Sequence, residues 1–386
     1  MKKKTLLVAF GVLCLLTSCS PETIGEQNCI EPETIFAYRA DGEVPRYPGS
    51  EIHPANPWVQ VASVPLESPQ LLAVRRIDDN ATELWLWNWL SAPGPSKQLY
   101  VYRTDDGSLK AVALDDSLTA TKPVEALYVL PNNSVWAVHS RRASSDVSIL
   151  GKYDETMESI KPVKALEGIN GPNADKTIVV MDSRTSVFWF LVPFDHIYSY
   201  DPYTDSLVRH MSIKSLDPID AAIASNGQIY ILNNYLTTYQ QIVEQTDLLY
   251  LYSPSTESID NVFYRLEENI YQKNLFVDHA GRLWTGSLGW LEPSGIWYQT
   301  IRSPLFVTTN LEGGGARVYR WQPPRIELES PDNTYWFSGP NGLFSLDFQK
   351  GEWCWVSTII SEIAHDAGGN LWIIGDGKVY RRPALP

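Results

Sequence analysis

The chain alternates between short apolar runs and polar turns for most of its length, and the alternation repeats. An apolar–aromatic pair recurs seven times, usually just after a polar turn. The pairs are Leu84-Trp85, Val135-Trp136, Val187-Phe188, Ile229-Tyr230, Leu283-Trp284, Tyr335-Trp336 and Leu371-Trp372. Their second residues are separated by 51, 52, 42, 54, 52 and 36 positions. Repetition at this period in short segments predicts a set of similar β-sheets.

A second repeat lies downstream of four of these pairs. Each copy has a strand that ends in Tyr, a turn of Asp, Pro, Ser and Thr residues, and a Ser-aliphatic restart; the copies cover residues 102–109, 153–160, 200–207 and 252–259. Pro202 and Pro254 fix φ for the turn, and Asp and Ser side chains accept hydrogen bonds from its backbone. The repeat predicts a β-hairpin at the same place in each unit.

A further apolar segment precedes several of the aromatic pairs, at residues 71–74, 126–129, 178–180 and 360–364. A unit is therefore expected to hold an inner strand, the aromatic strand, the strand that ends in Tyr, and an outer strand. Four antiparallel strands make one propeller blade. The sequence predicts an all-β protein, a seven-bladed β-propeller of four-stranded antiparallel blades.

The seventh unit has no room for an outer strand, because the chain ends at Pro386. Residues 58–64 precede the first full unit and alternate as a strand does. We expect this N-terminal strand to complete the last blade, which would close the ring and remove exposed sheet edges. An open solenoid is the alternative arrangement.

The N-terminus has the pattern of a secretion signal. Three lysines at positions 2–4 precede an apolar run over residues 5–16, which is too short to span a bilayer. The run leads into Leu16-Thr17-Ser18-Cys19, which resembles the lipobox of bacterial lipoproteins. The resemblance implies a signal peptide over 1–18 and lipidation of Cys19, including a palmitate-type chain. The alternative is an ordinary secreted protein.

The expected domains are therefore the signal peptide 1–18, a lipid-anchored tether over 19–56 and the propeller over 57–386. The tether region is rich in Pro, Glu and Gly and shows no sustained strand alternation. A lipid anchor at Cys19 would place the propeller in the bacterial cell envelope, on the extracytoplasmic side of a membrane.

The net charge bears on the class of binding partner, and the cysteine content bears on disulfide formation. The net charge is −14, and removal of the signal's three lysines makes the mature chain more acidic, which argues against a nucleic-acid partner. Cys29 and Cys354 remain after lipidation and removal of the signal. They either form a disulfide, as an oxidising compartment allows, or stay apart because Cys29 lies in the tether.

Three late units resemble the repeats of the two-component-regulator propeller family, which also occurs in ligand-binding sensor domains. The matching stretches, residues 278–287, 332–344 and 366–377, have an Asp or Gly turn, a Leu-Trp or Tyr-Trp pair and a Gly after the strand. This resemblance implies a propeller used for sensing or binding. A weaker similarity to streptogramin lyase implies His and Glu residues near the ring axis, for which His139, at the end of the second aromatic strand, is the candidate.

The candidate ligand-binding residues are Trp87, Trp89, Arg141, Arg142, Tyr235 and Tyr239. They fall in or beside segments longer than a tight turn, including the insertion 233–247, where propellers commonly bind. Aromatic, amide and guanidinium groups together suit a sugar or a peptide. The alternative is ordinary loop variation, with Trp87 packed between blades. No motif indicates a cofactor or a metal site.

The sequence therefore favours a non-catalytic module, anchored by lipid outside a bacterial membrane, that binds a small molecule, glycan or protein. The alternative is an extracytoplasmic lyase or hydrolase with a His and acid site near the propeller axis. Enzymatic activity is left open.

Overall fold

The computed structural model of the chain describes most of the region after residue 57. The described residues are 58–66, 69–88, 98–114, 124–139, 149–163, 166, 169, 176–239, 242–262, 274–285, 289–293, 297–299, 306–311, 317–322, 325–339, 342–348, 352–357, 363–375 and 377–384. This part of the chain is built from β-strands. It holds no helix with the length and apolar character that a membrane span requires.

The strands form groups of four that follow the chain. The first two groups are β2 (Pro69–Arg76), β3 (Thr82–Asn88), β4 (Gln98–Arg103) and β5 (Leu109–Leu114), then β6 (Val124–Val129), β7 (Val135–His139), β8 (Leu150–Asp154) and β9 (Ser159–Pro162). The next two are β10 (Ile178–Met181), β11 (Phe188–Leu191), β12 (His196–Asp201) and β13 (Ser206–Ser212), then β14 (Pro218–Ile223), β15 (Ile229–Tyr239), β16 (Ile242–Ser253) and β17 (Ser258–Val262). Within each group, consecutive strands pair antiparallel.

The C-terminal groups repeat the plan. They are β18 (Leu275–Val277), β19 (Leu283–Thr285), β20 (Gly289–Leu291) and β21 (Trp297–Gln299), then β24 (Arg325–Glu329), β25 (Thr334–Gly339), β26 (Gly342–Asp347) and β27 (Glu352–Ser357). The last sheet contains β28 (Ile363–His365), β29 (Leu371–Gly375), β30 (Lys378–Arg382) and β1 (Val59–Ser63). A separate two-stranded sheet, β22 (Phe306–Leu311) and β23 (Arg317–Gln322), lies between the β18–β21 and β24–β27 sheets in sequence.

The repeated pairs mark the second strand of each group, as predicted. Trp85, Trp136, Trp284, Trp336 and Trp372 lie in β3, β7, β19, β25 and β29, and each is at most 2% exposed. Three of these indoles are held by a side chain six residues upstream. Trp284 Nε1 donates to Asp278 (2.8 Å), Trp336 Nε1 to Ser330 (3.1 Å) and Trp372 Nε1 to Asp366 (3.0 Å). The acceptor belongs to the turn before the strand, so one side chain fixes both the turn and the ring.

The ends of the described chain meet in one sheet. β1 pairs antiparallel with β30, with Val59 opposite Arg381 and Ser63 opposite Lys378. The sheet order is β1-β30-β29-β28, so the N-terminal strand supplies the outer strand that the last unit lacks. The predicted closing strand is present.

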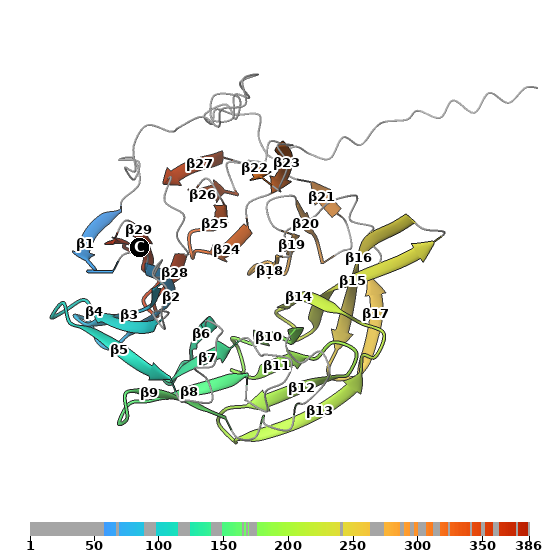
Figure 1. The fold of residues 1–386 in the computed structure, drawn as a ribbon, viewed down its shortest axis with the longest axis horizontal. Helices are drawn as coiled ribbons and strands as arrows, with labels where there is room; N and C mark the ends of the chain where they lie inside the picture. The colour runs from blue at the N-terminus through green and yellow to red at the C-terminus, as the bar shows by residue number, and fades with distance from the viewer. Residues whose placement is uncertain are drawn as a thin grey trace, which may run out of the picture.

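The hydrophobic core lies between the sheets. The buried residues described form seven clusters, and each joins two successive groups of strands. One cluster contains Leu71 and Leu84 from the first group together with Trp372 and Val379 from the last. The sheets therefore pack face to face in a closed ring. Figure 1 shows their first strands around the middle of the molecule, where neighbouring first strands contact each other.

Two features depart from a simple repeat. β5 and β9, the outer strands of the first two groups, pair in parallel through Ala113–Ser159 and Leu114–Ile160, so the eight strands form one sheet. The insertion 233–247, expected as a loop, is instead a continuation of β15 and β16. These strands pair from Ile229–Tyr252 out to Tyr239–Ile242 and extend beyond β14 and β17 (Figure 1).

Candidate functional site

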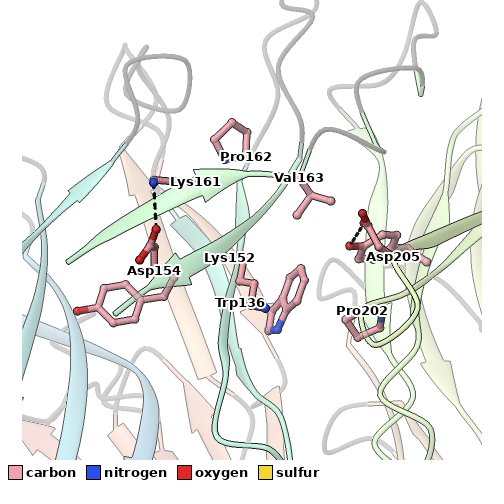
Figure 2. A pocket seen from close by; sticks show the side chains of 10 residues that line it. Trp136, Lys152, Asp154, Lys161, Pro162, Val163, Pro202 and Asp205 are labelled. Atoms are coloured by element: carbon pink, nitrogen blue, oxygen red, sulfur yellow. Dashed lines mark hydrogen bonds and ion pairs between the residues drawn. The ribbon is translucent and has the colours of Figure 1, made fainter. Parts of the chain in front are cut away.

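A pocket of about 700 Å³ lies between the β6–β9 and β10–β13 strand groups. One wall is formed by β8 and β9, and the other by the turn between β12 and β13 (Figure 2). Volumes of several hundred cubic ångströms are typical of small-molecule sites. The pocket is therefore the candidate functional site of the described chain.

The inner part of the pocket is formed by Trp136. Its strand β7 is apolar because it packs against the next sheet, where the indole contacts Phe188 and Tyr200 at centroid distances of 5.6 and 6.0 Å. The Nε1–H group donates to Ser134 Oγ at 2.9 Å. Trp136 is only 2% exposed, so its ring position is fixed by packing.

Lys152 brings a cation to this ring. Its Nζ lies 5.4 Å from the centroid of Trp136, within the range of a cation–π contact. Lys152 is on β8, opposite Trp136 on β7, so the sheet register brings the two side chains together. Among the described residues, Lys152 has no ion-pair partner. Its ammonium group is therefore available to a ligand.

The second lysine of the pocket is already paired. Lys161 Nζ lies 3.0 Å from Asp154 Oδ2 across the β8–β9 hairpin. Asp154 Oδ1 also accepts the backbone N–H of Thr156 at 2.9 Å, which stabilises the turn. The hydrogen bond from Lys161 is the main cause that lowers the pKa of the Asp154 carboxyl, and the turn N–H groups act in the same direction. Asp154 and Lys161 are therefore a mutually neutralised pair on the rim.

The opposite wall carries a carboxylate. The Tyr200 hydroxyl donates to Asp205 Oδ1 at 2.7 Å. Burial of Tyr200 and the bond to Asp205 together raise the pKa of the phenol, so it stays protonated and remains a donor. Asp205 lies in the turn with φ of 51°, a conformation that Asp tolerates, and Pro202 opens the same turn. Figure 2 shows Asp205 and Pro202 across the pocket from the Asp154–Lys161 pair.

The site offers recognition groups. It combines an indole, an unpaired ammonium group, a hydrogen-bonded carboxylate and the apolar side chains of Pro162, Val163 and Pro202. None of the described side chains that line the pocket is a Ser, Thr, Cys or His. The arrangement suits binding of a small amphipathic ligand.

Those predicted ligand contacts that the structure describes, Trp87, Tyr235 and Tyr239, are not among the residues that line this pocket. Trp87 is 2% exposed and belongs to the cluster between the first two strand groups, together with Trp85, Leu99 and Val135. Its burial agrees with the alternative of packing between blades. Tyr235 and Tyr239 lie in the extended β15, paired with Thr246 and Ile242 of β16.

The remaining predicted positions are largely outside the described residues. Cys19, Cys29, Trp89, Arg141 and Arg142 fall there. Cys354 lies in β27, opposite Ser345 of β26. The expected disulfide and the lipidation site therefore stay predictions.

His139 ends β7 but is buried, with 6% exposure. Neither ring nitrogen has a hydrogen-bond partner among the described residues, and burial lowers its pKa to about 4. The expectation that its loop would bring it to the axis beside an acid is not met by any described neighbour. The geometry is that of a neutral histidine in the core.

Lys152 and Asp205 were not among the site residues predicted from the sequence. Both lie in or beside the Tyr-ending hairpin repeats at 153–160 and 200–207, which indicate structure and not a site. The signal available was that two consecutive hairpins carry charged residues next to Tyr. Only the packing of adjacent sheets brings these groups to one pocket.

No protein-family model and no curated protein matches the sequence. Solved structures do match. Virginiamycin B lyase from Staphylococcus aureus has a TM-score of 0.52 and 12% identity, covering 84% of this chain and 98% of that chain. YCF48 bound to D1 peptide has a TM-score of 0.54 and 13% identity, covering 86% and 98%. The extracellular domain of the putative one component system BT4673 from B. thetaiotaomicron has a TM-score of 0.37 and 11% identity, covering 79% and 45%.

The first two likenesses, with the ring of antiparallel sheets, define the protein as a β-propeller. At these identities, they establish the fold alone.

Proposed function

We propose that the protein is a non-catalytic binding module, held by lipid on the extracytoplasmic side of a bacterial membrane, whose ligand occupies the pocket between β8–β9 and β12–β13. One observation carries the proposal: Lys152 lies on the indole of Trp136 in a 700 Å³ pocket and has no ion-pair partner among the described residues. Lys152 is exposed, so a ligand that enters the pocket can reach its ammonium group without breaking an existing ion pair.

We assign seven blades to the ring. The four-strand groups β2–β5, β6–β9, β10–β13, β14–β17, β18–β21 and β24–β27, with the closing sheet of β28–β30 and β1, support this number. The β22–β23 pair is then an insertion between the fifth and sixth blades.

Binding is tested by filling the pocket. Pro162→Trp places a large ring in β9 at the pocket wall, where a strand tolerates an aromatic residue. Differential scanning fluorimetry against a panel of sugars, sugar acids, amino acids and short peptides should show at least one ligand that raises the melting temperature of the wild type but not of Pro162→Trp. Ile77→Trp, on an exposed turn, is the matched control and should respond as wild type. Equal responses of wild type and Pro162→Trp would place any binding elsewhere.

Short peptides belong in that panel for a specific reason. YCF48, a propeller of similar fold, is known bound to D1 peptide. A protein or peptide partner is therefore within the range of this architecture, although the likeness concerns the fold.

The anchor is tested separately. Metabolic labelling with a palmitate analogue should mark the wild-type chain and leave Cys19→Ala unlabelled. Equal labelling of the two would exclude lipidation at Cys19. Membrane fractionation of the same cells should move the protein to the soluble fraction in the variant.

A second candidate function is hydrolysis, and one cluster favours it. Ser199 Oγ lies 2.8 Å from His210 Nε2, and His210 Nδ1 lies 3.5 Å from Glu257 Oε1. The residue types are those of the serine, histidine and acid triad of nucleophilic hydrolases, although His210 Nδ1 makes no hydrogen bond to Glu257 among the described residues. The cluster lies on β12, β13 and the turn before β17, away from the axial position expected from sequence.

A fluorophosphonate probe decides between the two functions. Labelling of wild type that is lost in Ser199→Ala, with the fold intact by circular dichroism, would favour hydrolysis. Absence of labelling at pH 8 would leave the cluster a structural hydrogen-bond pair.

A further inference from the structure

We infer that the pocket selects a monocarboxylate: a small amphipathic molecule with one carboxylate for Lys152, a hydrogen-bond donor for Asp205, and an apolar face for the pocket wall. This inference rests on the proposed binding function and specifies the ligand class of that site.

The anion preference follows from Lys152. Its ammonium is held 5.4 Å from the centroid of Trp136, and the lysine on the neighbouring strand, Lys161, is occupied by Asp154. A ligand carboxylate would be the first carboxylate to reach the Lys152 ammonium. Such charge-assisted hydrogen bonds are stronger than neutral ones.

The preference for a ligand with a single negative charge follows from the carboxylates of the pocket. Of the two carboxylates that line the pocket, Asp154 is paired with Lys161, whereas Asp205 has no ion-pair partner among the described residues. A dianion such as a phosphate monoester would meet one unpaired cation, Lys152, and would face the Asp205 carboxylate. The pocket therefore favours a carboxylate over a phosphate.

The donor requirement follows from Asp205. The Tyr200 hydroxyl uses Oδ1. A carboxylate oxygen has more than one lone pair, and Asp205 lies at the pocket edge, so a ligand hydroxyl, amide or ammonium group can add a second hydrogen bond.

Two sources of this chemistry fit the volume. One is a uronic acid, whose hydroxyl groups lie beside a carboxylate on an apolar ring face. The other is the C-terminal residue of a short peptide, with its amide N–H and apolar side chain. Both are small enough for about 700 Å³.

Isothermal titration calorimetry with matched pairs tests the inference. The probes are D-glucuronate against D-glucose, and N-acetyl-glycyl-L-phenylalanine against its C-terminal amide. At least one acid should bind about tenfold or more tightly than its neutral partner, since a charged hydrogen bond is at stake. The same affinity should fall as NaCl rises, and D-glucuronate should exceed D-glucose 6-phosphate in the sugar arm.

Lys152→Met removes the charge and keeps most of the stem, so the advantage of the acid should disappear in this variant. Lys378→Met, at an exposed position of β30, is the control and should bind as wild type. Equal affinity for acid and neutral partner, or unchanged binding by Lys152→Met, overturns the inference. If the ligand found in the fluorimetry panel is neutral, and its binding is lost in Pro162→Trp, the monocarboxylate inference is overturned while the binding function stands. No pocket-dependent ligand of any kind would overturn both.

Discussion

Val59 and Arg381 lie opposite each other in adjacent antiparallel strands, although they come from opposite ends of the described chain. Val64, which directly follows β1, and Val379 of β30 belong to the same buried cluster. Trp58 adds an edge-on contact with Trp336, at a centroid distance of 5.7 Å. The ring is therefore closed by backbone pairing and by apolar packing at one seam.

The seam predicts that N-terminal truncation unfolds the protein. A chain that begins at Ser68 loses β1, Val64 and the Trp58 contact, which leaves β30 as an open sheet edge and exposes apolar faces of the last sheet. Burial of one large apolar side chain stabilises by about 1.5–3 kcal/mol, and a typical domain has about 5–15 kcal/mol of stability. We expect that chain to be insoluble or molten by circular dichroism, and a chain that begins at Pro54 to melt cooperatively. Matching melts would contradict the role of β1.

Arg75 should be more important for stability than its neighbour Arg76. The Arg75 guanidinium is 5% exposed, donates from Nε to Glu83 at 2.7 Å and pairs with Glu155 of the next strand group. Removing one partner of a buried pair typically destabilises by about 3–5 kcal/mol. Arg75→Met should lower the urea midpoint accordingly.

Arg76→Met is the control, since Arg76 pairs with the exposed Asp79. Adding Glu83→Gln to Arg75→Met should restore part of the loss, because it removes the stranded charge. Midpoints equal for both single variants would show that the buried pair contributes nothing.

Asp366 should stabilise both the turn before β29 and the position of the Trp372 indole. Its carboxylate accepts the backbone N–H groups of Gly368 (2.8 Å) and Asn370 (3.0 Å) and the indole N–H of Trp372 (3.0 Å). Asp366→Ala leaves these donors without their acceptor, and we expect a loss of about 2–4 kcal/mol in chemical denaturation. Asp79→Ala, at an exposed turn aspartate, should change stability by less than about 0.5 kcal/mol.

His139 should make the fold sensitive to acid. Its pKa in the fold is about 4, below the ordinary value of 6.5, so the unfolded chain takes up the proton first. The contribution of neutral His139 is present above pH 6.5 and is lost as the pH falls toward 4, by about 3 kcal/mol in total. His139→Phe should reduce the loss of stability between pH 6.5 and pH 4, and should not lower the stability at pH 8.

The measurement is the urea midpoint between pH 8 and pH 4. Some dependence should persist in His139→Phe, since burial also lowers the pKa of His365. An unchanged profile would mean that His139 is hydrated or charged in the fold.

The strands were predictable because their signals are local. Leu84-Trp85 and its six counterparts mark second strands, and Tyr153 and Tyr200 end third strands, since alternation and turn residues act within a few positions. The spacing of Asp366 and Trp372 was also readable, and it could have predicted the indole hydrogen bond. The β15–β16 extension was missed although it alternates, because its polar and amide residues resembled a loop.

The pocket was not predictable from local pattern. Lys152 and Asp205 lie on neighbouring sheets, and their meeting depends on how β8 faces the β12–β13 turn. Trp87 is a second example of the limits of local pattern. It breaks the aromatic register in sequence, yet β3 is buried along its whole length, so the extra indole fills core space.

The parallel pairing of β5 with β9 has a mechanical consequence for ligand entry. Ser159 and Ile160, which pair with Ala113 and Leu114, directly precede the pocket residues Lys161 and Pro162. One wall of the pocket is thereby tied from behind to the preceding sheet, while the β12–β13 turn has no such tie among the described strands. We therefore expect the β9 side of the pocket to be the more rigid one, and a change in the width of the entrance to involve the β12–β13 turn.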